Sequence, residues 1–194
     1  MKRNLAMLVG VIVILIVYLT GTYNSLVTTR ENVSEAWAQI ENVYQRRADL
    51  IPNLVATVKG FAQQEQQVLI GVTEARAKVG QMQLKTSDLS NPKLFAQFQA
   101  AQGELGSALS RLMVVVEKYP DLKSNENFLA LQSQLEGTEN RISTERRRYN
   151  MLVQQYNLRI KRVPASLFAN MFGFVAVEYF KADAGASAAP KVAF

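Results

Sequence analysis

The stretch "RRADLIPNLVATVKGF", residues 46–61, decides how the rest of the chain is interpreted. Its apolar residues recur at helical spacing, which predicts a helix. Two residues conflict with a simple buried stripe: Pro52 stands in the middle, and Arg47 falls where the next apolar residue is expected. A proline inside a helix removes one backbone hydrogen bond and costs about 3 kcal/mol unless its surroundings compensate. A helix through this stretch therefore needs compensation at both positions.

The apolar stripe continues on both sides of this stretch in alternating steps of four and three. Such a seven-residue repeat is typical of coiled coils and long bundle helices. It predicts one helix over residues 27–77, with a break at Pro52 as the alternative. The stripe contains Leu26, Val33, Trp37, Ile40, Tyr44, Ile51, Leu54, Val58, Phe61, Val68 and Val72.

Two further amphipathic segments follow, each bounded by turn signals. The first covers residues 94–119 after a turn that contains Gly80 and Pro92, and the second covers residues 128–156 and ends before Pro164. Strand-like alternation of useful length is absent from the sequence. The chain is therefore predicted to be all-α, with an N-terminal transmembrane helix followed by an elongated antiparallel three- or four-helix bundle.

The N-terminus has the properties of a membrane anchor. No charged residue occurs between Arg3 and Arg30, and the apolar residues 5–23 would span about 28 Å as a helix. That length is close to the hydrocarbon thickness of a bilayer, about 30 Å. The small residues 20–22 match a signal-peptidase site only weakly, so a retained anchor is predicted in preference to a cleaved signal peptide.

Charges beside the span predict its orientation. Lys2 and Arg3 precede it, whereas Arg30 beyond it is offset by Glu31. The positive-inside rule then keeps the N-terminus in the cytoplasm and places the bundle outside it. The expected organisation is a short tail at 1–4, the transmembrane helix at 5–23, the bundle domain at 24–163, an apolar C-terminal segment at 164–180 and a flexible tail at 181–194.

Composition argues against an enzyme. The 194 residues include no cysteine and no histidine, which removes thiol nucleophiles, imidazole bases and the usual zinc ligands. Di-metal sites in helical bundles normally use Glu-x-x-His motifs, so no catalytic, metal or cofactor site is expected. The net charge of +6 permits anionic partners. The membrane anchor and the lack of a known nucleic-acid-binding motif argue against nucleic acid as a partner.

A self-association surface is expected in the first half of the stripe. The turns place Pro52 level with Tyr119, so the preceding stripe has no helix of its own chain to cover it, unless the helix folds back at Pro52. Exposed apolar stripes usually mark association surfaces. Arg47 is expected to meet an acid on a neighbouring copy, or Asp121 or Glu126 in the turn. The residues assigned to self-association are Val33, Trp37, Ile40, Tyr44, Arg47 and Ile51.

Two segments near the C-terminus have unusual composition. Residues 141–162 hold seven Lys or Arg against one Glu, and a solvated helix face is the favoured interpretation. Residues 166–180 are apolar but too short for a second span, and packing on protein is expected in preference to a membrane interface. The candidates for contact with anionic lipid are Arg146, Arg147, Arg148, Arg159, Lys161 and Arg162.

Several motifs together resemble the LemA family. They are "AWAQI" at 36–40, "RRADLIPNLV" at 46–55, "TEARA" at 73–77, "YNLRIKRVPASLFANMFGF" at 156–174 and "APKVAF" at 189–194. The resemblance implies a single-pass protein of the bacterial inner membrane with a helical bundle. The expectation that the bundle faces the periplasm comes from the charge argument above.

The resemblance brings no catalytic residues, and it suggests links to a membrane zinc metalloprotease and to envelope stress. The expected function is a non-enzymatic membrane-anchored scaffold that self-assembles into a homo-oligomer, in envelope stress or protein quality control. Its expected partners are copies of itself, the lipid bilayer and another membrane protein. The alternatives are an adaptor for a protein such as a membrane metalloprotease, or an anionic-lipid-binding module.

Overall fold

The computed structural model describes residues 2–181, without the side chain of Arg3. The predictions for residues 1 and 182–194, most of the flexible tail among them, lie outside the described residues. Within that range the chain is helical and contains no strand, so the predicted fold class is confirmed. The elements are α1 (Lys2–Phe61), α2 (Gln66–Gln81), η1 (Thr86–Ser90), α3 (Pro92–Val116), α4 (Pro120–Lys123), α5 (Glu126–Lys161) and η2 (Ala165–Leu167).

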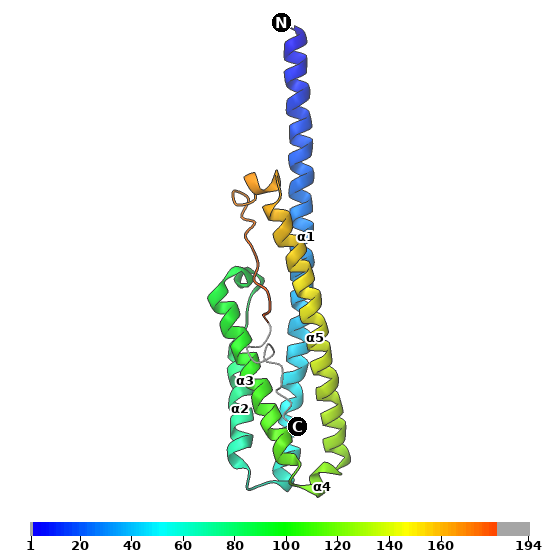
Figure 1. Ribbon diagram of the computed structural model, residues 1–194, viewed down its shortest axis with the longest axis vertical. Coiled ribbons are helices and arrows are strands. Elements are labelled where there is room, and N and C mark those ends of the chain that lie inside the picture. Colours follow the sequence, from blue (N-terminus) through cyan, green and yellow to red (C-terminus); the bar gives the residue numbers. More distant parts are fainter. Residues whose placement is uncertain (1, 182–194) are drawn as a thin grey trace, which may run out of the picture.

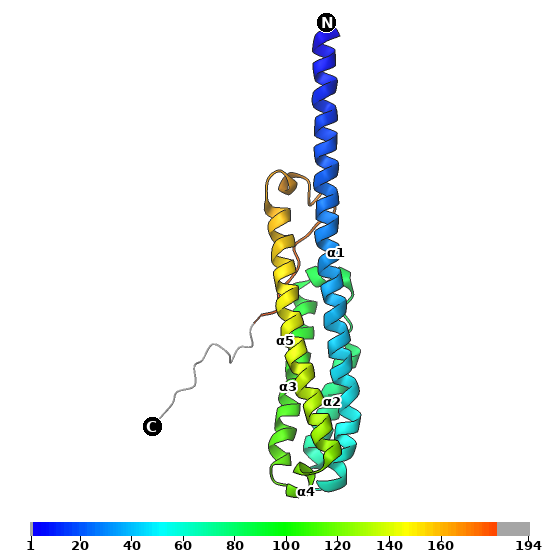
Figure 2. The ribbon, with the colours of Figure 1, turned by 90° about the vertical axis from the view of Figure 1, so that its right-hand side faces the viewer.

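The helix α1 organises the molecule. Its N-terminal part projects alone from the bundle, and its remainder is flanked by the antiparallel α5 (Figure 1). The helix α2 turns back along α1, and α3 runs in the opposite direction beside α2 (Figure 2). The end of the bundle at α4 therefore contains four helices. The end nearer the N-terminus contains only α1 and α5, completed by the chain that follows α5.

Two clusters of buried residues form the core of the described chain. The cluster nearer α4 joins α1, α2, α3 and α5. The other cluster surrounds Trp37, which is 1% exposed. The ring centroid of Trp37 lies 5.3–6.2 Å from those of Phe95, Phe98, Tyr149 and Phe180. One indole thus brings together α1, α3, α5 and the C-terminal segment.

The course of α1 corrects the prediction for this region. The helix passes through Pro52 and ends at Phe61, so both an unbroken helix to residue 77 and a break at Pro52 are wrong. Residues 62–65 reverse the chain direction. The apolar repeat keeps the same register on both sides of this turn and therefore favours one helix, although the polar run 63–67 places Glu65 on a stripe position. Ala62 is buried at the turn, while the predicted stripe residue Phe61 is 43% exposed.

The stripe assigned to self-association is covered within the protomer. The error lay in placing the start of the third helix level with Pro52; α4 and the start of α5 lie at the far end of α1, and α5 runs back along it (Figure 2). The premise that no helix of the same chain covers the stripe is therefore wrong. In this fold the stripe is not available to a second copy. The exposed fractions are Val33 2%, Trp37 1%, Ile40 1%, Tyr44 6%, Arg47 3% and Ile51 0%.

A side chain from α2 compensates for Pro52. Because proline has no N–H, the carbonyl of Ala48, four residues earlier, loses its helical hydrogen-bond donor. The Nε of Arg76 donates to that carbonyl at 2.9 Å. The ring of Pro52 itself lies on the exposed face of α1. The continuity of α1 and the docking of α2 are thus linked by one hydrogen bond.

We expect Arg76→Met to destabilise the protein in a way that depends on Pro52. Leaving the Ala48 carbonyl without a donor should cost about 1 kcal/mol in the free energy of unfolding. In a Pro52→Ala background the restored N–H satisfies that carbonyl, so the same substitution should cost less. Denaturant unfolding of the four proteins in detergent measures this coupling.

The matched control is Lys78→Met on the same helix. The ammonium of Lys78 pairs with Glu104 at 2.6 Å, and both side chains are half exposed, so its loss should change stability by no more than about 0.5 kcal/mol. Equal losses for Arg76→Met with and without Pro52 would contradict the compensation.

Candidate functional site

The buried polar and charged side chains of the described residues mainly join one helix to another. Among residues 2–181, no three His, Cys, Asp or Glu side chains gather where they could hold a metal ion. The buried polar or charged residues in this range are Arg47, Gln102, Thr138 and Asn157. Their contacts define a polar clamp, a C-terminal strap and a groove, and the surfaces around them are the candidate interaction sites.

Arg47 clamps three helices together. Its Nη1 donates to the Glu139 carboxylate on α5 at 2.9 Å, and its Nη2 donates to the backbone carbonyl of Gln102 on α3 at 3.3 Å and also to the side-chain oxygen of Gln102. The guanidinium also lies 5.1 Å from the centroid of the Tyr44 ring. The expected acceptors, Asp121, Glu126 or a second copy, are wrong. Arg47 and Glu139 each lie about fourteen residues from the α4 end of their helices, and antiparallel packing therefore brings them level.

The chain after α5 returns along the bundle as a strap, residues 174–181. Asn150 on α5 accepts from the N–H of Phe180 and donates to its carbonyl, both at 2.9 Å. Asn157, one heptad later, makes the same pair with Val177 at 3.0 and 2.8 Å. Two amide side chains thus supply the hydrogen bonds that a neighbouring strand would otherwise provide.

Two tyrosines add to this recognition of the strap backbone. The hydroxyl of Tyr149 donates to the carbonyl of Glu178 at 3.2 Å, and that of Tyr156 donates to the carbonyl of Val175 at 3.0 Å. Burial, helped by the nearby Glu178 charge, raises the pKa of the Tyr149 phenol, which keeps it a neutral donor. The sequence signal for this site was a Tyr-Asn pair repeated after seven residues, at 149–150 and 156–157, which the sequence analysis did not use.

The strap also completes the apolar core. Phe174, Val177 and Phe180 are buried at a spacing of three residues, which suits an extended chain with a three-residue period. Gly173 precedes them with a φ of 75°, a conformation that glycine adopts without strain. The expected packing of the apolar segment on protein therefore holds for its buried residues, which also include Phe168 and Ala169, whereas Leu167 and Met171 are exposed.

A groove between α3 and α5 begins where the strap ends. Gln99 on α3 and Arg146 on α5 both donate to the carbonyl of Lys181, at 2.7 and 3.2 Å. Beyond this point the two helices stay apart over two adjoining cavities of about 250 and 630 Å³. The face of α3 that lines them carries the small residues Gly103, Gly106, Ser107 and Ser110.

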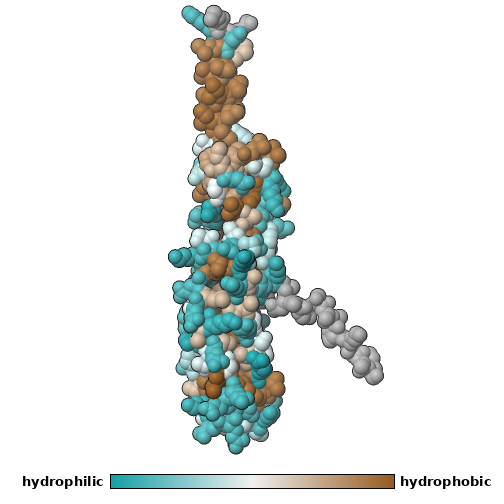
Figure 3. All heavy atoms as spheres, turned by 90° about the vertical axis from the view of Figure 1, so that its left-hand side faces the viewer, coloured by the Kyte–Doolittle hydropathy of each residue, from teal (hydrophilic) through white to brown (hydrophobic). Residues whose placement is uncertain are grey.

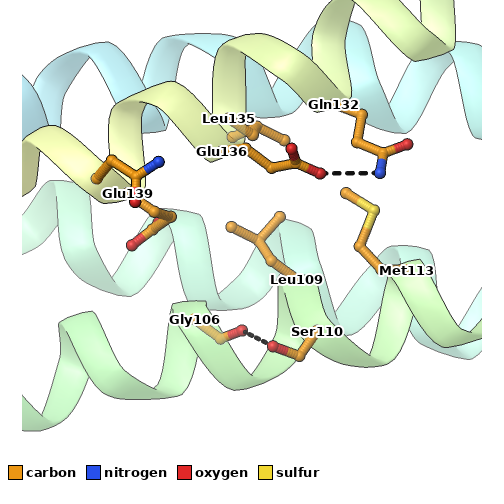
Figure 4. Close-up of a pocket in the computed structure, with 9 residues that line it drawn as sticks. Gly106, Leu109, Ser110, Met113, Gln132, Leu135, Glu136 and Glu139 are labelled. Atoms are coloured by element: carbon orange, nitrogen blue, oxygen red, sulfur yellow. Dashed lines mark hydrogen bonds between the residues drawn. The ribbon is translucent and has the colours of Figure 1, made fainter.

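The groove combines an apolar floor with polar walls. Leu109 and Leu135 face each other across it, and Glu136 and Glu139 line its α5 side (Figure 4). The Arg47 clamp lies at the inner wall of the smaller cavity, where the buried Nε has no hydrogen-bond partner among the described residues. Such a groove can accept hydrogen bonds and apolar side chains from a bound polypeptide.

The basic residues proposed for lipid contact lie in two separate groups along α5. Arg159, Lys161 and Arg162 are exposed at the C-terminal end of α5, next to the projecting part of α1 (Figure 1). The arginines at 146–148 lie about 20 Å further along α5, away from that end. Arg146 there binds the strap, and Arg148 lies 3.8 Å from Glu35. The candidate lipid contact is therefore retained for the first group alone.

Fold and site together define a membrane-associated helical protein. Among residues 2–181, α1 is the one helix apolar over enough length to cross a bilayer, and the apolar part is uncovered by the bundle. The sequence model of the LemA family matches residues 36–194. The chain belongs to the LemA family, as its motifs indicated.

Curated relatives agree with this assignment. The chain is 30% identical to the magnetosome protein MamQ of Magnetospirillum gryphiswaldense, covering 91% of this chain and 71% of that protein. It is 29% identical to magnetosome protein MamQ 2 of Paramagnetospirillum magneticum, covering 88% and 68%. Protein LemA of Metamycoplasma hominis is 24% identical, covering 84% and 70%. None of these names denotes an enzymatic activity.

We expect Glu139→Ala to destabilise the protomer, because it leaves the Arg47 guanidinium buried without its carboxylate. The loss in unfolding free energy should be about 1–3 kcal/mol. That is less than for a fully buried pair, since the Glu139 side chain is 48% exposed and partly screened by water. Thermal or denaturant unfolding measures it.

Glu136→Ala, on the same groove wall, is the control and should cost no more than about 0.5 kcal/mol. In an Arg47→Met background, the cost of Glu139→Ala should disappear. If that cost persists, Glu139 acts independently of Arg47.

Proposed function

We propose that this protein is a non-enzymatic, membrane-anchored scaffold of the bacterial inner membrane. The single observation that carries the proposal is the continuity of α1, whose 60 residues run from the apolar N-terminal segment to Phe61 at the far end of the bundle. The rigidity of an uninterrupted helix suits a protein that holds a binding surface at a fixed distance from a bilayer. The use of Arg47, Asn150 and Asn157 in packing supports the same proposal.

Self-assembly into a homo-oligomer is part of this proposal, but it no longer rests on the stripe from Val33 to Ile51. Two other surfaces can support it. One is the apolar N-terminal part of α1, uncovered by the bundle. The other is the groove between α3 and α5. Envelope stress or protein quality control is the setting proposed for the assembly.

An adaptor for another membrane protein, such as a metalloprotease, is the second candidate, and the groove is the observation that favours it. The upper part of the space between α3 and α5 already holds an extended chain, the strap, through side-chain hydrogen bonds to its backbone. The groove continues in line with the strap from Gln99 and Arg146. The adaptor proposal assigns it an extended segment of another polypeptide.

Mass measurement of particles extracted directly from membranes into native nanodiscs separates the two candidates. The scaffold proposal expects particles that contain several copies of this chain and no other protein in fixed ratio. The adaptor proposal expects one other polypeptide in fixed ratio, and Gly106→Phe should remove it by filling the groove. A Cβ at Gly106 meets no atom within 4 Å, so the fold should tolerate this change.

Gly137→Phe is the matched control, since Gly137 is an exposed helical glycine on α5 with equally open surroundings outside the groove. Loss of the second polypeptide in both variants would contradict groove binding. Particles with a single copy of the chain and nothing else would contradict both candidates.

We also propose that the bundle lies on the periplasmic side, which follows from Lys2 and Arg3 before the span. The chain has no cysteine, so Val114→Cys, 68% exposed on α3, provides a single label site. A membrane-impermeant maleimide should label it in intact spheroplasts, and the cysteine-free parent provides the background. Labelling only after lysis of the membrane would place the bundle in the cytoplasm.

A further inference from the structure

We infer that the loop after α5 is a membrane-docking collar that inserts apolar side chains into an anionic bilayer interface beside the transmembrane helix. The collar comprises residues 163–172. Three of its side chains point away from the protein, with Val163, Leu167 and Met171 exposed by 79%, 78% and 77%. Apolar side chains exposed to this degree on one short loop require an explanation, because nothing in the protomer covers them among the described residues.

The collar is fixed to the bundle by its other side chains. Ala165 and Ala169 are buried in the core cluster nearer the N-terminus. Phe168 is also buried. The ring of Phe168 meets that of Phe172 at 6.0 Å between centroids. The loop therefore has one face that packs on the protein and one face that presents Val163, Leu167 and Met171 outward.

The position of the collar indicates that its outward face contacts the bilayer interface. The ring of Tyr23, the last residue of the apolar stretch 5–23, lies 5.4 Å from that of Phe172 and 5.6 Å from that of Phe174. The collar thus lies level with the end of the segment that spans the bilayer. Figure 3 shows the apolar surface of the projecting helix and an apolar patch on the adjoining shoulder of the bundle. Aromatic side chains at this depth are typical of membrane interfaces.

The charges around the collar select the kind of bilayer. Arg159, Lys161 and Arg162 are exposed immediately before it, and no acidic residue occurs from 146 to 177. On α1, Arg30 near this end is offset by the adjacent Glu31, so the positive charge comes from the end of α5. Basic residues beside a membrane surface are attracted to anionic headgroups. Anionic lipid should therefore strengthen docking of the collar.

The inference goes beyond a scaffold with a single anchor, because it adds a second attachment that resists tilting of the bundle on the transmembrane helix. It depends on the span but is independent of the groove and of the number of copies. A bundle attached only through α1 would leave the collar in water.

Site-specific fluorescence on the full-length protein in nanodiscs tests the inference. Leu167→Cys and Met171→Cys would each carry an environment-sensitive NBD label, with Val114→Cys, 68% exposed near the α4 end of α3, as the control. The nanodiscs would contain either phosphatidylcholine alone or phosphatidylcholine with phosphatidylglycerol. Lipids with a nitroxide on the upper acyl chain and aqueous iodide would serve as opposing quenchers.

We expect the labels at 167 and 171 to show blue-shifted emission, strong quenching by the lipid nitroxide and weak quenching by iodide. The shift should grow with phosphatidylglycerol, and the label at 114 should show none of these effects. Iodide quenching equal to that of the control would overturn the inference. Protection from both quenchers would also overturn it, since protein would then cover the collar.

Discussion

The continuity of α1 through Pro52, which the hydrogen bond from Arg76 to the carbonyl of Ala48 supports, is the constraint on which the rest of the structure depends. Proline deprives that carbonyl of its donor, and the guanidinium of a different helix replaces it at 2.9 Å. With this bond in place, α1 remains one rod through Pro52, and α2 is held against it at a defined level. The reversal of the chain is displaced to residues 62–65, which allows α5 to cover α1 along the length of the stripe.

The two ends of the bundle solve the packing problem differently. Near α4, four helices bury a continuous apolar cluster. At the end nearer the N-terminus only α1 and α5 continue, and the strap replaces the missing helices. An extended chain has unsatisfied backbone groups, and Asn150 and Asn157 satisfy them in pairs. The C-terminal segment is consequently part of the fold, and its turn back toward the bundle leaves residues 163–172 at the end of the bundle nearest the apolar part of α1.

Much of the fold could be predicted from the sequence, because periodicity and span length report directly on helices. The helical class, the long apolar N-terminal helix and the positions of the apolar stripe followed from that pattern. The covering of the stripe by helices of the same chain did not. The turn at 62–65 did not, since the repeat keeps its register across the turn and the polar run 63–67 contains neither glycine nor proline to mark a boundary. The position of α5 was wrong for the same reason, and with it the acceptor of Arg47. The strap was not predicted, because it depends on side-chain amides that form hydrogen bonds with an extended backbone. The repeated Tyr-Asn pair was the available sequence signal for it.

The distance between two points on α1 on either side of Pro52 tests the central claim most directly. Spin labels at Glu31→Cys and Lys59→Cys, both exposed, would be introduced into the cysteine-free chain and diluted with unlabelled protein in nanodiscs. Pulsed electron–electron double resonance should give one distance near 42 Å, which is about the length of a continuous helix between these residues. The spin labels add a few ångströms to it. A dominant distance of roughly half that value would mean that the chain folds back at Pro52, and it would contradict the account.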